Sequence, residues 1–307
     1  MPKTSIINRE RLEEVNKMVN AIFIDSLDQM GEGELFDAVV MRVNSNQESE
    51  THNWMKDYSQ LREWVGPRIF PALEAEGLTI KNKEYEASME IARKDIILDR
   101  LGMLDNRVKQ LPEAYFRGKR KQLADLILNG HLTTGPGGVG FDGVAFFSNA
   151  HPNADLANQS NVASSGTALD GANFDAAVEQ MELLVNHRGE PMDITPDTLV
   201  IGPKLRASAR SLFQIQTTNA GGQNEYFGAI DNIRIEQRIT DNSWYLFDTS
   251  KSIKPIIEQT VVPMELSSQT DLSDDRVFNY NKYAWGIYAF FGMGYGLWQL
   301  AYRNPGV

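Results

Sequence analysis

The segment from residue 77 to residue 98 constrains the fold most, because charged and apolar side chains alternate along much of its length. The pattern predicts two extended runs that join in a hairpin, with Tyr85 and Met89 among the apolar positions. The turn would be formed by Lys81, Asn82 and Lys83. Each arm of about nine residues would extend roughly 30 Å at the usual rise of a strand. A hairpin with so many charges cannot bury both faces in its own domain, so we expect it to lie on another surface.

The first 53 residues are predicted to form an N-terminal arm that contains one amphipathic helix. Apolar residues recur at helical spacing between residues 8 and 29, with Asn8 as a candidate N-cap and Gly31 after the last turn. The apolar stripe consists of Leu12, Val15, Val19, Ile22 and Leu27. A Gly-Glu-Gly-Glu break and a polar run follow, and they separate this helix from the extended runs.

A second helix is predicted over residues 112–129. Pro112 suits the first turn of a helix, and Gly130 suits its C-terminal stop. An 18-residue helix would be a rod of about 27 Å. Its basic residues are Arg117, Lys119, Arg120 and Lys121. They could contact DNA phosphates, although a solvated helix face is the more common outcome for such a charge run.

The remainder of the chain predicts an α+β fold. Residues 131–173 are rich in Gly, Ser, Asn and Ala and are expected to form a long surface loop with one buried patch. Further on, the patterns predict a helix after residue 174, a strand, turn and helix around Pro203, and three short strands. Between residues 277 and 302, aromatic and apolar residues alternate as in a half-buried strand.

Composition excludes several classes of function. The chain of 307 residues has no cysteine, which excludes disulfides, thiolate nucleophiles and Cys-ligated metal sites. Its net charge of −11 argues against sequence-specific DNA binding, although a protein can enclose DNA without gripping it. No signal peptide or membrane-spanning run is evident, so we expect a cytoplasmic protein that does not enter a membrane.

No motif for catalysis or for a cofactor stands out, and we expect neither a catalytic site nor a cofactor nor a metal. The four histidines are not spaced for zinc, and the acidic turn with Asp271, Asp274 and Asp275 does not match a calcium loop. The Gly-rich run 135–140 lacks the strand and the Gly-Lys-Ser/Thr ending of a phosphate loop. A hydrolytic enzyme with a site in the loop of residues 131–173 remains the alternative of a different class.

Four pieces of the sequence together resemble the Mu-type phage major head subunit family. They are QLREWVGPRIF at 60–70, LTIKNKEYEASMEIARKDIILDRLG at 78–102, FDGVAFFSNAHPN at 141–153 and GYGLWQLAY at 294–302. The resemblance spans most of residues 54–302. It implies the major capsid protein of a tailed double-stranded DNA phage, a structural protein of the virion that is made in the host cytoplasm. An encapsulin-like compartment shell is the alternative on the same fold.

The resemblance also implies the Hong Kong ninety-seven type phage capsid fold. The expected parts are an N-terminal arm at 1–53, an extended hairpin loop at 54–105, a peripheral domain with a spine helix at 106–173, an axial domain at 174–285, and a C-terminal strand at 286–307 that returns to the peripheral domain. The helix of residues 112–129 would be the spine helix.

The resemblance implies that surface residues of this chain make contacts between subunits. Pentamers and hexamers of the chain would build the shell, and the candidate subunit contacts are Leu12, Val15, Val19, Ile22, Lys81, Asn82, Lys83, Tyr85 and Met89. The other implied partners are a separate scaffolding protein, a portal, a decoration protein and the packaged DNA. In the founding member of this fold a Lys–Asn bond welds the shell, but adjacent Lys and Asn at a turn do not predict such a weld here.

Overall fold

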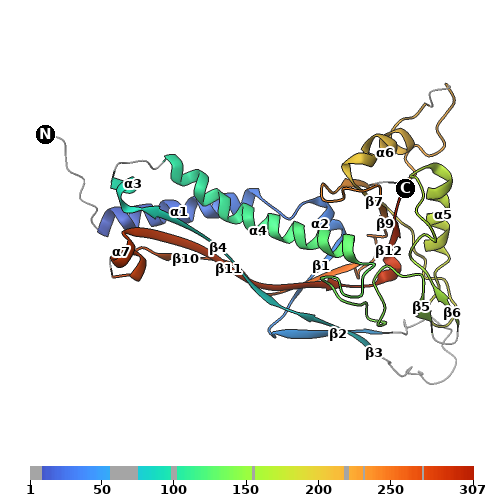
Figure 1. Cartoon of the computed structure of the whole chain (residues 1–307), viewed down its shortest axis with the longest axis horizontal. Helices are drawn as coiled ribbons and strands as arrows, with labels where there is room; N and C mark the ends of the chain where they lie inside the picture. The colour runs from blue at the N-terminus through green and yellow to red at the C-terminus, as the bar shows by residue number, and fades with distance from the viewer. Residues whose placement is uncertain are drawn as a thin grey trace, which may run out of the picture.

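The computed structural model describes residues 9–55, 75–97, 102–153, 156–217, 221–230, 232–271 and 273–307. The molecule is elongated, with a long twisted sheet and two helices at one end and a compact block around a second sheet at the other (Figure 1). None of the described helices is long and apolar enough to cross a lipid bilayer.

The long sheet contains four strands in the order β1-β10-β11-β4. These are β1 (Val40–Asn44), β10 (Ile256–Gln269), β11 (Lys282–Tyr295) and β4 (Lys83–Ala92). β1 runs parallel to β10, and β11 runs antiparallel to both of its neighbours, β10 and β4. Alternate side chains of β11 are buried, namely Tyr283, Trp285, Ile287, Ala289 and Phe291. This alternation confirms the half-buried strand that was predicted near the C-terminus.

Two long helices, α1 (Arg9–Gln29) and α4 (Gly102–Asn129), pack against each other and on one face of the long sheet. Two hydrogen bonds fix α1 on the sheet: Asn16 of α1 accepts one from the Trp285 indole and donates one to Thr270. The helix predicted at 8–29 is therefore confirmed, apart from Asn8, which lies outside the described residues. Its apolar stripe was expected to contact another copy, but it packs on an apolar stripe of α4 in the same chain.

The helix that was expected to begin at Pro112 begins ten residues earlier, and Pro112 lies inside it. Proline lacks the N–H that a helix interior uses, so the prediction ended the helix there. Leu104, Val108 and Leu111 continue the apolar stripe toward the N-terminus and are buried against α1 and β11. Tertiary packing over these extra turns outweighs the local cost of the proline.

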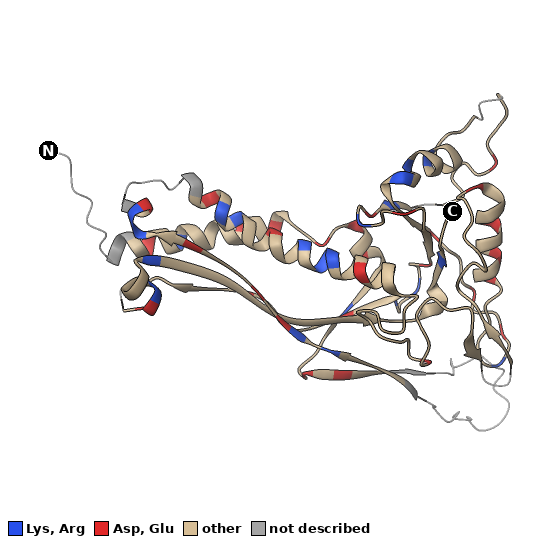
Figure 2. Cartoon of the chain, in the orientation of Figure 1, with Lys and Arg blue, Asp and Glu red and all other residues tan. Residues whose placement is uncertain are grey.

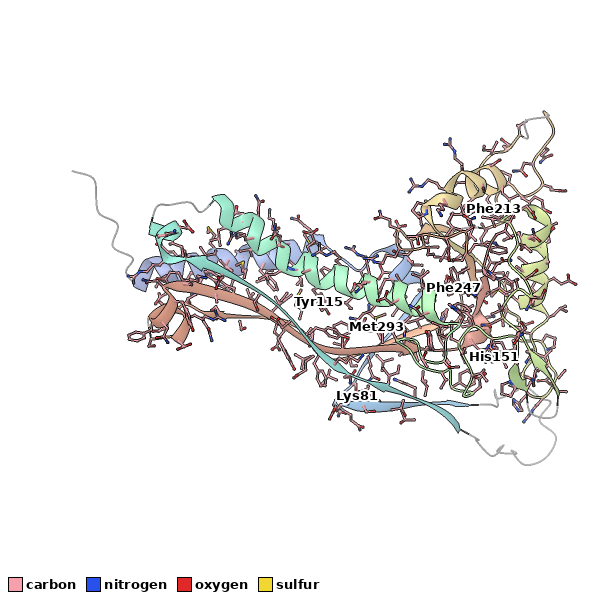
Figure 3. All side chains as sticks on the ribbon, viewed as in Figure 1. Lys81, Tyr115, His151, Phe213, Phe247 and Met293 are labelled. Atoms are coloured by element: carbon pink, nitrogen blue, oxygen red, sulfur yellow. The ribbon has the colours of Figure 1, made fainter. Side chains whose placement is uncertain are left out.

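The compact block is built on a second sheet in the order β12-β9-β7-β8. Its strands are β12 (Ala301–Asn304), β9 (Trp244–Phe247), β7 (Thr198–Ile201) and β8 (Asn232–Ile235). β7 and β8 are parallel, and α6 (Arg206–Phe213) lies in the crossover between them. α6 and α5 (Gly171–Glu182) contribute Phe213 and Phe174 to the same core as Phe247 (Figure 3).

The predicted hairpin of residues 77–98 is wrong in its pairing, although both of its strands exist. β3 (Ala75–Lys81) pairs with β2 (Ser49–Met55), and β4 pairs with β11 instead of β3. Asn82 is buried between β3 and β4, so the chain passes through Lys81-Asn82-Lys83 in extended form and does not turn back. The true hairpin is β2–β3, and its connecting residues 56–74, which include the 60–70 motif, lie outside the described residues.

Two boundaries also differ from the expected parts. β10 was expected in the axial region 174–285, but it pairs with β1 and β11 beside α4. The strand expected at 286–307 is divided between the two sheets: residues 286–295 lie in β11 of the long sheet, whereas the last strand, β12, pairs with β9 in the second sheet. A single turn of helix, η2 (Trp298–Leu300), carries the chain from β11 to β12.

The other elements are short. They are α2 (Glu34–Val39), α3 (Arg93–Ile97), α7 (Asp275–Tyr280), β5 (His151–Asn153), β6 (Leu156–Gln159) and η1 (Pro203–Leu205). The expected long loop of residues 131–173 contains β5 and β6, and its last residues begin α5 at Gly171; its buried patch includes Phe146 and Phe147.

Candidate assembly surfaces and a buried charge network

The β2–β3 hairpin leaves the long sheet as a separate two-stranded ribbon (Figure 1). Thr51 and Thr79 face each other across it, with their hydroxyls 2.9 Å apart, and both are exposed. Leu78 and Ile80 near its base are buried in the same core as Phe247. A two-stranded ribbon is only marginally stable alone, so the part beyond the base has to gain contacts elsewhere.

A fully buried glutamine fastens the base of this hairpin to the long sheet. Nε2 of Gln259, in β10, donates to the backbone oxygen of Ile80 and to Oδ1 of Asn82, each at 2.8 Å. Its Oε1 lies 2.9 Å from Nε2 of His52, in β2. Asn82 donates in turn to the backbone oxygen of Gln47 at 2.7 Å. Both arms of the hairpin are therefore joined to β10 at one point.

Two glycines of β11 let the hairpin base cross the sheet at close range. A Cβ atom at Gly292 would lie 2.8 Å from Oδ1 of Asn82 and from the backbone oxygen of Lys81. A Cβ atom at Gly294 would lie 2.7 Å from Cγ1 of Ile80. Any larger residue at these positions would push β3 away from β11, which explains the Gly-Met-Gly spacing near the end of the strand.

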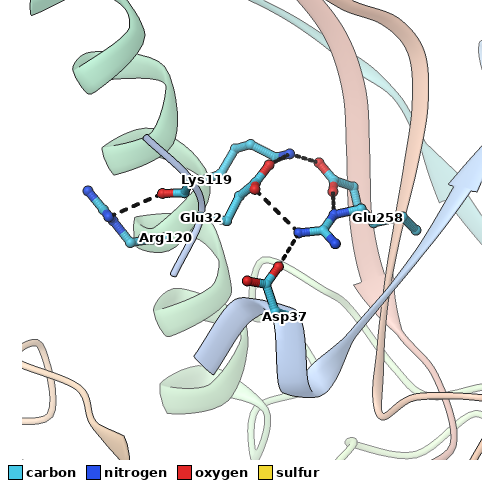
Figure 4. A network of polar contacts seen from close by, with 7 residues as sticks. Glu32, Asp37, Lys119, Arg120 and Glu258 are labelled. Carbon is cyan, nitrogen blue, oxygen red and sulfur yellow. Dashed lines mark hydrogen bonds and ion pairs between the residues drawn. The ribbon is translucent and has the colours of Figure 1, made fainter. Parts of the chain in front are cut away.

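A network of charges lies at the centre of the molecule, between α4, β10 and the start of the long sheet (Figure 4). Nζ of Lys119 lies 2.6 Å from Oε1 of Glu32 and 2.6 Å from Oε1 of Glu258. Arg42, in β1, reaches Glu32 at 3.3 Å and Asp37 at 2.5 Å. The side chains of Lys119 and Glu258 are 4% and 1% exposed, so this pair lies in the interior, whereas Arg42 and Asp37 form the exposed end of the network.

Burial and pairing act in opposite directions on these groups. Burial alone would lower the pKa of Lys119, but the facing carboxylates, chiefly Glu258, outweigh it and raise that pKa. Burial raises the pKa of Glu258, and the attraction of Lys119 offsets only part of this effect. Glu32 is less deeply buried, and its hydrogen bond to Lys119 lowers its pKa against the effect of burial. Glu258 is therefore the member of the network that most readily takes up a proton.

Aromatic rings enclose the same ammonium group. Nζ of Lys119 lies 5.1 Å from the ring centroid of Phe36, 5.2 Å from that of Tyr115 and 5.6 Å from that of Phe291. Figure 3 places Tyr115 on the side of α4 that faces the sheet. Cation–π attraction from three rings favours a charged Lys119 at this site.

The expected subunit contacts divide into buried and exposed groups. Leu12, Val15 and Val19 are buried in the chain's own core, because α4 covers them, and they offer no surface to a second copy. Ile22 and Met89 pack at the edge of that core, Asn82 is buried, and Tyr85 stacks on Phe291. Lys81 and Lys83 remain exposed, and Lys81 pairs with exposed Glu48.

The four expected DNA-facing residues do not share one environment. Arg117 and Lys121 are exposed on α4. Lys119 belongs to the buried network and cannot reach DNA, and half-buried Arg120 lies 3.5 Å from the backbone oxygen of Gly31. Their spacing on the helix explains the difference, since 119 points toward the sheet while 117 and 121 point away. Figure 2 shows several basic positions along the length of α4.

Exposed aromatic residues at the far end of the long sheet were missed. Phe278 and Tyr280, on α7, are 80% and 60% exposed. The guanidinium of Arg276 lies over the Tyr280 ring at 5.7 Å. The sequence could have predicted this exposure, because FNY follows a polar, charged segment and belongs to no periodic apolar pattern that would bury the two rings.

Of the two histidines in the loop of residues 131–173, His151 has a structural role. His151 is fully buried, with Nδ1 2.6 Å from Oδ2 of Asp142 and Nε2 3.1 Å from Oδ1 of Asn161. Its ring stacks on Trp298 at 3.7 Å. Both ring nitrogens are thus occupied by structural partners, and no serine hydroxyl takes either place. This arrangement does not support the alternative of a hydrolytic site built on His151.

Metal binding finds no support in the described part of the chain, where no three His, Asp or Glu side chains converge as a metal site would require. Asp271 and Asp274 are used locally, since Asp274 accepts from the backbone N–H of Asp271 at 2.8 Å.

A family model of the Mu-like prophage major head subunit gpT matches residues 12–168, 159–237 and 229–306. The Mu-like prophage FluMu major head subunit of Haemophilus influenzae is 27% identical over 264 residues, which are 86% of this chain and 64% of that protein. The major capsid protein of Escherichia phage Mu is 25% identical over 88% of this chain and 66% of its own length. This chain thus spans slightly less than two thirds of the length of both relatives.

The backbone also resembles solved structures. A chain from the procapsid of bacteriophage JBD30 superposes with a TM-score of 0.61 at 22% sequence identity, and the match covers 98% of this chain and 77% of that one. The similarity therefore includes both the long sheet with its helices and the compact block.

Proposed function

This chain belongs to the Mu-like prophage major head subunit family, and from this we propose that it is the major capsid protein of a tailed phage. Its fold is the Hong Kong ninety-seven type capsid fold. In the proposed role many copies form a closed icosahedral head that retains double-stranded DNA, and the chain itself performs no catalysis. The observation that carries this proposal beyond family membership is the β2–β3 hairpin, whose described residues are bonded to β10 at the base of the hairpin.

The fold suggests a new assignment of the expected parts. We assign the extended loop to β2, β3 and the residues between them, in place of 54–105. The peripheral domain comprises the long sheet with α1 and with α4 as its spine helix. The axial domain comprises the second sheet with α5 and α6. This assignment rests on strand pairing, which separates the two sheets completely.

Contacts between copies are proposed at two places that expose side chains. The hairpin, with Lys81 near its base, would lie across one neighbour, where an extended ribbon can pair or pack. The α7 tip, with Phe278 and Tyr280, would contact another copy, because large exposed aromatic residues are typical of interfaces. Two different surfaces per subunit suit rings that close into a shell.

The packaged DNA would face Arg117 and Lys121 without sequence specificity. The net charge of −11 suits a container that holds its contents by closure and does not bind them tightly. Separate scaffolding and portal proteins complete the proposed set of partners. A decoration protein is proposed by analogy with the JBD30 capsid, which is described as decorated with minor capsid protein trimers.

Electron microscopy of a hairpin variant tests the proposed role. Residues 53–77 are replaced by Asn-Gly, so that the paired residues His52 and Leu78 are joined by a two-residue turn. The variant keeps the bonds of Gln259 to Ile80 and Asn82, and we expect a folded subunit that forms no closed shells. The unaltered chain should form shells or rings. Normal shells from the variant, or small compact oligomers from the unaltered chain, would contradict the proposal.

A further inference from the structure

α4 passes through two separate hydrophobic cores. Leu104, Val108 and Leu111, in its N-terminal half, belong to the core around α1 and the far end of β11. Leu123 and Leu126, in its C-terminal half, belong to the core of the compact block. We call the part around the first of these cores the distal half and the rest the proximal half. The angle between the halves sets the shape of the subunit.

Between the two cores, which we call the junction, the backbone hydrogen bonding of both α4 and the sheet is irregular, so it defines this angle only weakly. Pro112 removes one bond from the interior of α4. β10 has two register shifts against β11, between Thr260 and Val262 and between Val262 and Glu265. Shifts of this kind bend and twist a strand locally. The helix and the sheet are thus both irregular between the two cores.

The charge network occupies this junction. Lys119 lies on α4 between the two apolar stretches, and Glu258 lies on β10 just before the register shifts. The rings around the ammonium come from both sides, since Phe36 belongs to the proximal core and Tyr115 packs against the distal one. The two short contacts of Lys119, each 2.6 Å, join α4 to β10 and to Glu32 and so restrict the position of the helix relative to the sheet.

Stability alone does not account for such a network. Removing two charges from water costs about as much as their attraction returns, and apolar replacements of buried ion pairs often keep or increase stability. Glu258, Glu32 and Asp37 also outnumber the two cations Lys119 and Arg42, so the network retains an excess negative charge. What a buried pair supplies better than apolar contacts is a single geometry.

We propose that Lys119 and Glu258 are positioning residues that fix the angle between the distal and proximal halves, and that this angle sets the curvature and hence the diameter of the assembled shell. The inference rests on the proposed function, because only an assembling subunit converts its own shape into a shell diameter.

The test separates shape from stability with a paired replacement. In Lys119→Met with Glu258→Leu, both charges are removed together, methionine enters the aromatic surround, and Glu32 keeps Arg42 as a partner. We expect its unfolding temperature to stay within about 4 °C of the wild type, whereas Lys119→Met alone leaves the buried Glu258 with only the longer contact to Arg42, at 3.9 Å, and loses about 10 °C. Shells of the paired variant, measured by electron microscopy, should have a shifted or broadened distribution of diameters.

Lys109→Met is the matched control, since it changes an exposed lysine on the same helix that has no part in the proposed contacts, and it should leave the diameters unchanged. Wild-type diameters from the paired variant would overturn the inference and leave the proposed function intact. If the paired variant does not fold, Lys119→Arg decides: it keeps the charge but not the geometry, so unchanged diameters would again overturn the inference. Absence of shells from the wild type would defeat both the proposed function and the inference.

Discussion

Single buried polar residues decide where the elements of this molecule meet. Gln259 shows this most clearly, because one amide joins β2, β3 and the residue after β3 to β10. A buried amide that satisfies several partners also specifies their register, since any shift leaves a donor or acceptor unpaired. These roles are invisible in the sequence, where Gln259 lies within an ordinary apolar strand far from its partners.

Gln259→Leu is expected to destabilise the subunit by about 2–4 kcal/mol, because it leaves the oxygens of Ile80 and Asn82 buried without donors. Urea unfolding of unassembled protein measures the change. Gln269→Leu, an exposed position on the same strand, is the matched control and should change stability by less than about 0.5 kcal/mol. Equal effects of the two substitutions would contradict the role given to the amide.

Glu258 should give the stability of the fold a recognisable pH dependence. Its pKa in the folded chain lies above the ordinary value of 4.5, so the folded state binds the proton more tightly than the unfolded state. The contribution of Glu258 to stability therefore increases as the pH falls from neutral toward 4.5. Glu258→Gln removes this contribution, and its stability relative to the wild type should decline between pH 7.5 and pH 5, as followed by urea unfolding.

The exposed Glu265→Gln, on the same strand, serves as the control and should keep a constant difference from the wild type over this range. Glu32 works in the opposite direction, because its lowered pKa means that its stabilising effect disappears only below pH 4.5. A constant difference for Glu258→Gln as well would show that burial does not control this carboxyl group.

At the scale of elements, periodicity predicted most helices and strands, and the errors concern pairing. The alternation in residues 282–295 and the stripe on α1 are both real. The hairpin prediction for residues 77–98 was wrong for two reasons. Alternation shows which side chains share a face of a strand but not which strand lies beside it, and Lys-Asn-Lys has the composition of a turn. The start of α4 failed because a proline signal is local, whereas the contacts that extend the helix come from α1.

The environments of the candidate site residues could not be predicted from the sequence, also for physical reasons. Exposed Arg117 and Lys121 could not be separated from buried Lys119 because the partners of Lys119, Glu32 and Glu258, lie in distant parts of the chain. The first apolar stripe was assigned to another copy because no sequence pattern says which of two amphipathic surfaces a stripe will meet. Contacts between distant segments depend on the fold, and spacing carries no information about them.

Glycine content provides a test at the element scale. Gly118 lies inside α4, and a Cβ atom there would meet nothing within 4 Å. Gly118→Ala is expected to stabilise the subunit by about 0.5–1 kcal/mol, since alanine has the higher helix propensity. At Gly292 a Cβ atom would lie 2.8 Å from Asn82 and Lys81, so Gly292→Ala should destabilise it. Thermal unfolding measures both, and the same sign for the two changes would contradict the packing described.

The molecule is elongated, and the contacts proposed with other copies lie toward its two ends. The long sheet carries α7 at one end, and the compact block and the hairpin lie toward the other (Figure 1). The large exposed aromatic residues of α7, at one end of the long sheet, suit contact with another copy, because they would otherwise favour aggregation.

Phe278→Ser combined with Tyr280→Ser should prevent shell formation and leave the unfolding temperature nearly unchanged, since both side chains are exposed in the subunit. Light scattering during assembly and calorimetry of the subunit provide the two measurements. Leu183→Ser, an exposed apolar residue at the end of α5, is the comparison and should assemble normally. Normal assembly of the double variant would remove α7 from the proposed contacts.

The central claim is that this chain builds a shell through surfaces that it cannot satisfy alone, and a reconstruction of an assembled particle by electron cryomicroscopy tests it most directly. We expect rings of five and six copies in which each β2–β3 hairpin lies on a neighbouring subunit while Gln259 holds its base. A particle in which the hairpin contacts only its own subunit, or a protein that yields only small compact oligomers, would contradict the account.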